Sequence, residues 1–210
     1  MKIFTFIRTY SDSAAFADTP LSARNGGDAR SKDAYYTMQE STVLRSGNPF
    51  FVPDFDTEFR AYPSLCLRIG RLGKGIAPRF AHRYFESWTM AVAVIATGTL
   101  KQLREQGEPW SAAVSFDRSC WLGNLQPIDT LLEYDTFEVE CGETRHTYDV
   151  SKITPAKEKL ISILSRDNTL KNGDLILAAL DPRGITLTPG QHLKISSKTK
   201  GIELTDIKIR

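Results

Sequence analysis

The chain has 210 residues, of which 41% are hydrophobic and 25% charged, and its formal net charge is +2. These values fit one globular domain, residues 1–210, with a sizeable core. The charge is too small to indicate a nucleic-acid partner. The start carries Arg8 and has no long apolar stretch, and the longest aliphatic run, Met90–Ala96, is far below the roughly 20 residues of a membrane helix. Three separated cysteines without a CxxC pair favour a reducing compartment. We expect a cytoplasmic protein with no membrane partner.

The first half of the chain predicts strands, loops and one long helical region. Lys2–Arg8 alternates apolar and polar residues, as a strand does, and Leu65–Gly70 is a short apolar strand. The polar stretch Ala17–Asp33 predicts a mobile loop, and Pro49–Asp56 an ordered connection. Ala77–Gln106 is broadly helical, although its β-branched part near Gly98 allows a strand or kink to intrude.

The second half is richer in strands. A helix is expected to begin at Thr154-Pro155, with the threonine as N-cap and proline in the first turn, and to end near Ser165. The fold class is therefore mixed α/β, mainly β, with a few helices flanking a sheet or closed barrel. The expected strands are Phe137–Cys141, Asp174–Leu180, His192–Ser197 and Gly201–Ile209.

Several motifs, in order, resemble those of the fumarylacetoacetate hydrolase family, most closely its short bacterial members named 2-hydroxyhepta-2,4-diene-1,7-dioate isomerases or acylpyruvate hydrolases. The resemblance covers nearly the whole chain and implies a mixed β-roll and a homodimer. The motifs are Pro49–Asp54 (PFFVPD), Arg68–Ile76 (RIGRLGKGI), Phe80–Tyr84 (FAHRY), Gly107–Trp110 (GEPW), Phe116–Asp117 (FD) and the C-terminal GDLILAALDPRGITLTPGQHLKI.

Enzymes of that family act on short diketo or hydroxy-dienoate acids with a divalent ion, which the resemblance implies would be Mg²⁺, Mn²⁺ or Ca²⁺. Three carboxylates hold the metal, two of them in an E-x-E pair whose i and i+2 residues share one side of a strand. A lysine before the Phe-Asp pair stabilises negative charge, and a His–Glu pair near the N-terminus activates water.

The corresponding positions of this chain lack those groups. Tyr62, Ser64 and Ala93 stand at the metal-ligand positions, and Val114 replaces the lysine. Tyrosine, serine and alanine cannot provide the charged oxygen ligands of a divalent cation, so the expected cofactor is none. Further replacements are Ser13 and Phe16 at the water-activating positions, Thr97-Gly98 for an Arg-Asp pair, Ile7–Tyr10 for a Gly-Arg-Asn-Tyr motif, and Leu180 or Asp181 for a late threonine.

No other residues restore the site. The nearby acids Asp54, Asp56, Glu58 and Glu86 are expected in turn, surface or helix-face roles. The three histidines have no ligand spacing such as i, i+4.

Three functional hypotheses remain. The loss of metal, lysine and water-activating groups favours a protein without catalytic activity, which binds or interacts with a partner such as a small organic acid. The alternative is a hydrolase, isomerase or tautomerase of small diketo or hydroxy-dienoate acids that uses altered residues without a metal. A third is a subunit paired with an active relative. Whether Tyr62 plugs the former site stays open. The candidate cleft residues are Arg8, Tyr10, Tyr62, Lys74 and Asp117.

Overall fold

The structure is a computed structural model that describes residues 1–7, 9–10 and 34–210. The predicted loop Ala17–Asp33 lies outside the described residues, as do Arg8, Ser13 and Phe16. The segment Pro49–Asp56 contains no helix or strand of its own, as expected for a connection.

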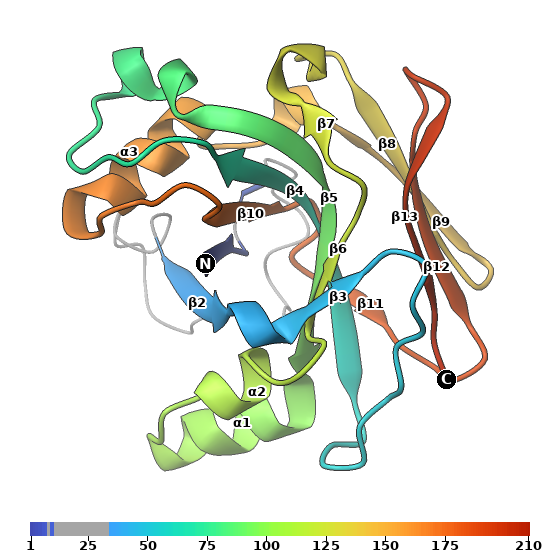
Figure 1. Ribbon diagram of the computed structural model, residues 1–210. Helices are drawn as coiled ribbons and strands as arrows, with labels where there is room; N and C mark the ends of the chain where they lie inside the picture. Colours follow the sequence, from blue (N-terminus) through green and yellow to red (C-terminus); the bar gives the residue numbers. More distant parts are fainter. Residues whose placement is uncertain (8, 11–33) are drawn as a thin grey trace.

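The described strands form two sheets, of which the larger curls round on itself (Figure 1). Its order is β2-β1-β10-β4-β5-β6-β3, with β11 paired to β4 and β7 to β5. The two edge strands, β2 and β3, are joined only by the short 3₁₀ turn Glu40–Thr42, so the two edges approach each other and enclose an inner face. The bounds are β1 Lys2–Phe6, β2 Tyr35–Gln39, β3 Val43–Arg45, β4 Phe59–Ile69, β5 Phe85–Ala96, β6 Cys120–Leu122, β7 Gln126–Pro127, β10 Leu175–Ala179 and β11 Ile185–Thr186.

The centre of the large sheet is the antiparallel pair β4 and β5. The expected strand Leu65–Gly70 is part of β4, which begins six residues earlier at Phe59. The helical prediction for Ala77–Gln106 is wrong in its middle, because Phe85–Ala96 is the strand β5. All but one of its side chains are buried, and a run apolar on both faces suits a central strand better than a one-sided helix.

Helices lie at the ends and on the outside of this sheet. α1, Thr97–Gln106, and α2, Ser111–Val114, lie together below the sheet in Figure 1, whereas α3, Lys157–Asp167, lies at its upper left. A 3₁₀ helix covers Pro78–Arg83. Within the described part of the chain, no helix has the length and apolar character needed to cross a membrane.

The start of α3 differs from the prediction. The N-cap is Ala156 rather than Thr154, and the helix begins at Lys157. The backbone N–H of Thr154 donates to the carbonyl of Thr9 at 2.7 Å, and Ile153 forms a β-bridge with Tyr10. This pairing holds Thr154 in an extended segment, so it cannot take the first helical turn.

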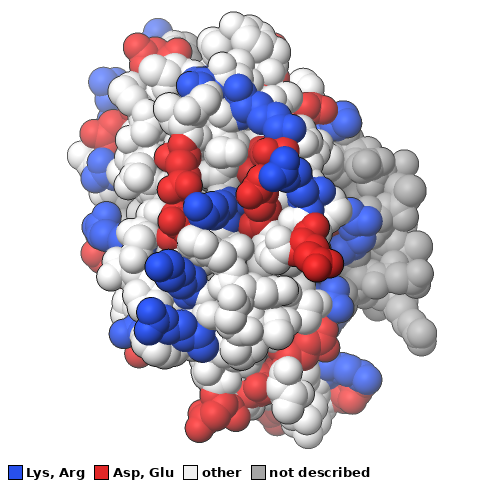
Figure 2. All heavy atoms as spheres, turned by 90° about the vertical axis from the view of Figure 1, so that its right-hand side faces the viewer, with Lys and Arg blue, Asp and Glu red and all other residues white. Residues whose placement is uncertain are grey.

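The smaller sheet has the order β13-β12-β8-β9 and lies at the right of Figure 1. Figure 2 shows this side of the molecule, with positive and negative side chains interspersed. Some of these opposite charges form ion pairs between neighbouring chain segments; Lys198 Nζ, for example, lies 2.6 Å from a carboxylate oxygen of Glu138. The four expected strands of the second half are confirmed within two residues: β8 Thr136–Cys141, β10 Leu175–Ala179, β12 His192–Ser197 and β13 Ile202–Lys208. The smaller sheet also contains β9, Thr144–Asp149, which was not predicted.

Two hydrophobic clusters lie on opposite faces of the curled sheet. The outer cluster packs the large sheet against α3 and the smaller sheet, and includes Phe4, Trp88, Trp121, Phe137 and Leu160. The inner cluster lies inside the curl and packs against α1 and α2. It consists of Ile3, Ile7, Tyr36, Met38, Tyr62, Cys66, Ala91, Ala93, Ile95, Leu100, Ala113, Val114, Cys120, Leu122, Leu175, Leu177 and Ala179.

Candidate active site

The residues at the family's metal and lysine positions meet inside the curled sheet. Tyr62 and Ser64 are two residues apart on β4, so they point to the same face. Ala93 on β5 is the direct cross-strand partner of Tyr62. Val114 on α2 belongs to the same inner cluster and is almost fully buried. The strand pairing and the short helix α2 therefore bring these four positions, distant in the sequence, to one place.

These residues do not fit a divalent cation. Ser64 donates its hydroxyl hydrogen bond to the backbone carbonyl of Tyr62 at 3.0 Å, and Ala93 offers only a methyl group. Among the described residues, no group of three or more His, Cys, Asp or Glu side chains could hold a metal ion. Divalent ions of this kind need several oxygen ligands, most of them carboxylates. The donor set on these strands cannot provide them.

What the inner cluster contains instead is a pair of tyrosine hydroxyls. Tyr62 is completely buried and Tyr36 is 9% exposed. Neither hydroxyl has a hydrogen-bond partner within the described part of the chain. The hydroxyl of Thr5, which donates to Met38 Sδ at 3.6 Å, lies close enough to the hydroxyl of Tyr36 to lower its pKa. A buried hydroxyl without a partner costs about 1–3 kcal/mol, and such groups often mark functional positions.

The surroundings keep these groups protonated. Burial raises the pKa of Tyr36 above the usual tyrosine range, and the nearby Cys120 and Tyr62 raise it further. Burial likewise raises the pKa of Tyr62, although the charge of Arg60 opposes this. Burial also raises the pKa of the Cys120 thiol to about 12. At neutral pH these groups are therefore neutral hydrogen-bond donors and acceptors, not anionic bases or ligands.

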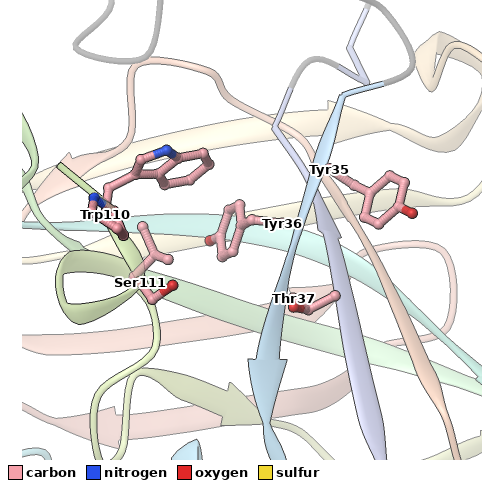
Figure 3. A pocket seen from close by; sticks show the side chains of 7 residues that line it. Tyr35, Tyr36, Thr37, Trp110 and Ser111 are labelled. Carbon is pink, nitrogen blue, oxygen red and sulfur yellow. The ribbon is translucent and has the colours of Figure 1, made fainter. Parts of the chain in front are cut away.

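A pocket of about 310 Å³ opens beside Tyr36 (Figure 3). Tyr36 points from β2 toward Trp110 and Ser111, whereas its neighbour Tyr35 points the other way. The rings of Tyr36 and Trp110 meet edge to face, with centroids 6.1 Å apart. The described residues that line the pocket are Tyr35, Tyr36, Thr37, Pro109, Trp110, Ser111 and Val114.

A tight segment covers Tyr62 at the rim of the curled sheet. Gly184 has φ +66°, and a Cβ there would lie 2.9 Å from the ring of Tyr62, so glycine is needed for both reasons. The buried Asp181 holds this segment by accepting from the backbone N–H and the guanidinium of Arg183 and from the hydroxyl of Tyr148 at 3.0 Å. Burial alone would raise the pKa of Asp181, but these hydrogen bonds lower it below the usual value.

All but one of the nearby acidic residues have structural partners. Asp56 accepts from the backbone N–H of Thr99 at 2.6 Å and so caps the start of α1, which differs from the surface role expected for it. Glu58 pairs with Arg60, and Glu86 with Arg68, each at 2.8 Å. Asp54 is exposed.

The candidate cleft residues do not form one cluster. Lys74 lies in the loop that pairs with the end of α3, on the outer side of the sheet. Tyr10 packs edge to face against Tyr148, also in the outer cluster, and Asp117 is exposed after α2. Of the five, Tyr62 alone belongs to the inner cluster among those described.

Sequence reasoning missed Tyr36, because strand β2 was not predicted. A signal was available: Tyr36 and Met38 alternate with exposed Thr37 and Gln39, which is the pattern of a strand with one buried face. Trp110 was recognised only as part of a motif.

The chain belongs to the family described as "Fumarylacetoacetate (FAA) hydrolase C-terminal", whose model matches residues 2–199. Solved structures confirm the fold. The fumarylpyruvate hydrolase from Pseudomonas aeruginosa, solved with Mn²⁺ and pyruvate, has a TM-score of 0.83 at 16% identity, covering 100% of this chain and 89% of that one. A putative fumarylacetoacetate isomerase/hydrolase from Oleispira antarctica has a TM-score of 0.84 at 18% identity, covering 100% and 93%.

Curated relatives are enzymes by name. The mitochondrial oxaloacetate decarboxylase of Dictyostelium discoideum is 24% identical over 174 residues, covering 80% of this chain and 79% of that protein. The mitochondrial oxaloacetate tautomerase FAHD1 of Rattus norvegicus is 25% identical over 158 residues, covering 74% and 71%. The expectation that this chain is not an enzyme is therefore wrong: proteins similar to it along most of their length are hydrolases, decarboxylases, isomerases and tautomerases.

Proposed function

We propose that this protein is an enzyme that interconverts the keto and enol forms of small 2-oxo acids, and that it does so without a divalent ion. The observation that carries the proposal is the pair of buried, unpartnered hydroxyls of Tyr36 and Tyr62, because the ring of Tyr36 also lines a pocket. A substrate's oxygen atoms would supply the missing hydrogen bonds. The existence of relatives named tautomerases agrees with this reaction class.

The chemistry suits neutral groups. In the enol-to-keto direction, the hydroxyl oxygen of Tyr36 accepts the proton from the enol oxygen while its own proton passes to C3. The C2=C3 π electrons form the new C–H bond, a lone pair on oxygen forms the C2 carbonyl, and the tyrosine ends as it began. Tyr62, which lies close enough to Tyr36 to raise its pKa, provides the second hydroxyl for the substrate oxygen.

Tautomerisation is favoured over C–C hydrolysis by the charges that each reaction needs. Hydrolysis requires an activated water and a cation or metal that stabilises the departing enolate. The described inner cluster offers hydroxyls, thiols and hydrocarbon, with Val114 where the family places its lysine. A proton relay through one neutral hydroxyl develops little net charge, so it fits this environment.

The test is the rate of enol disappearance in oxaloacetate and phenylpyruvate, followed by ultraviolet absorbance with excess EDTA. We expect Tyr36→Phe to lower kcat/KM by about 10²-fold or more, the usual contribution of a proton-transfer group. Tyr62→Phe should lower it by about tenfold, as expected for one lost hydrogen bond. Tyr134→Phe, at a side chain that is 69% exposed, is the matched control and should change nothing.

Two results would overturn the proposal. One is an unchanged rate in Tyr36→Phe. The other is activity that EDTA abolishes and Mn²⁺ restores, since that would place a metal in the reaction. The homodimer and the cytoplasmic location stay predictions; sedimentation of the purified chain tests the first.

A further inference from the structure

We propose that the pocket beside Tyr36 selects 2-oxo acids with an uncharged aromatic substituent, such as arylpyruvates, over dicarboxylates. This inference rests on the proposed function and adds the class of substrate. It follows from the chemistry of the pocket lining, which includes the ring of Tyr36.

The pocket lining is neutral throughout its described residues. It consists of three aromatic side chains, one proline, one valine and two hydroxyl-bearing residues. No described Lys, Arg or His lines it to pair with a carboxylate. A second carboxylate placed there would lose its hydration without gaining a charged partner, which is costly. The carboxylate at C1 can stay at the mouth, beside the exposed Ser111.

Trp110 offers a surface for a flat, apolar group. Its side chain is 41% exposed, whereas Trp88 and Trp121 are completely buried. Tyr36 meets it edge to face, which fixes the inner side of the indole and leaves another part of it open to the pocket. A planar ring on such a surface gains both apolar burial and favourable aromatic geometry. A volume of about 310 Å³ suits a small ligand.

The orientation of Tyr36 links this surface to the reaction. Its hydroxyl is buried and without a partner among the described residues, and its ring forms part of the pocket wall. A ring stacked on Trp110 places the attached C3 and the oxygen at C2 beside the ring of Tyr36, and the buried hydroxyl becomes reachable once the side chains around it shift. The same residue thus serves both the recognition of the substituent and the proton transfer.

The test measures binding by calorimetry, with EDTA present, of phenylpyruvate and of 2-oxoglutarate. Both ligands are fully equilibrated, so catalysis of tautomerisation produces no net change. We expect phenylpyruvate to bind at least about tenfold more tightly than 2-oxoglutarate. The reason is that 2-oxoglutarate has no aromatic ring to contact Trp110 and would place a second carboxylate without a charged partner in the pocket. Binding should also quench the fluorescence of Trp110, the exposed tryptophan.

Two substitutions separate the causes. Trp110→Leu should weaken phenylpyruvate binding by about tenfold and leave the weak binding of 2-oxoglutarate unchanged. Ser111→Lys adds a cation at the mouth and should reduce the preference by favouring the dianion. Phe80→Leu, at another exposed ring outside the pocket, is the control for loss of an aromatic side chain.

Equal affinity for the two acids, or loss of phenylpyruvate binding in Phe80→Leu but not in Trp110→Leu, would overturn the inference. These outcomes are distinct from failure of the proposed function. If Tyr36→Phe abolishes turnover but the two ligands bind equally, the selectivity is wrong and the reaction stands. If phenylpyruvate binds selectively but its enol does not disappear faster, the selectivity stands and the reaction is wrong.

Discussion

The two faces of the curled sheet use their buried residues differently. The outer cluster is built from large apolar and aromatic side chains whose polar atoms are satisfied: the indole N–H of Trp88 donates to Thr130 at 2.9 Å, and that of Trp121 to the carbonyl of Arg118 at 2.9 Å. The inner cluster has small alanines, thiols and two tyrosine hydroxyls without partners in the described chain. One face is organised for stability, and the other keeps polar groups that stability alone would remove.

The comparison also explains why loss of the family ligands does not imply an inert interior. Three neutral residues in place of carboxylates remove mutual repulsion and allow closer packing. If stability were the only result, the hydroxyls of Tyr36 and Tyr62 would be expected to find partners. Their isolation, together with the pocket beside Tyr36, is the feature that separates a site from a filled core.

The largest effect is expected on the outer face. Trp88→Ala removes a completely buried ring that packs at a tilt against Phe137, so it should lower the free energy of unfolding by about 3–5 kcal/mol. Urea unfolding followed by circular dichroism measures this. Trp110→Ala is the same chemical change at a half-exposed site and should cost less than about 1 kcal/mol. Equal losses would contradict the contrast between a packed core and an open pocket wall.

An intermediate effect is expected at the rim between the two faces. Asp181→Asn replaces the carboxylate that Arg183 and Tyr148 contact, so it should cost about 2 kcal/mol at neutral pH, as for hydrogen bonds to a charged group. Because the folded state lowers the pKa of Asp181, its contribution is present above the usual aspartate pKa and is lost as the pH falls through that range and below. Unfolding at neutral and at acidic pH measures both effects.

In acid, therefore, the wild type and Asp181→Asn should become more similar in stability. A difference between them that stays constant from neutral to acidic pH would show that the carboxylate charge does not hold the segment over Tyr62.

Much of the fold could be predicted from local patterns. Alternation in Phe137–Cys141 and His192–Ser197 located two strands of the smaller sheet, since one of their faces is buried and the other solvated. The pattern failed in Phe85–Ala96, because a strand buried on both faces does not alternate. Local spacing of apolar residues cannot separate that case from a buried helix.

The site was only partly predictable for a different reason. The motif resemblance indicated Tyr62, Ser64, Ala93 and Val114, and the pairing of β4 with β5 and the position of α2 bring them together. Tyr36 reaches the same interior from an edge strand, through the curl of the whole sheet. No spacing within the sequence connects it to the others, so it required the three-dimensional structure.

The smallest expected effect is an increase in stability, on the inner face of the curled sheet, whereas the substitutions above decrease it. Tyr62→Phe removes a buried hydroxyl that has no described partner, so it should raise the free energy of unfolding by about 1 kcal/mol. Because burial raises the pKa of Tyr62, the unfolded chain ionises first as the pH rises above about 10, and the wild type loses stability there. Tyr62→Phe should lose less. Urea unfolding at pH values on both sides of 10 measures this difference. A Tyr62→Phe variant that is more stable yet less active would show that the hydroxyl is kept for catalysis. A destabilised variant would instead assign Tyr62 to the packed core.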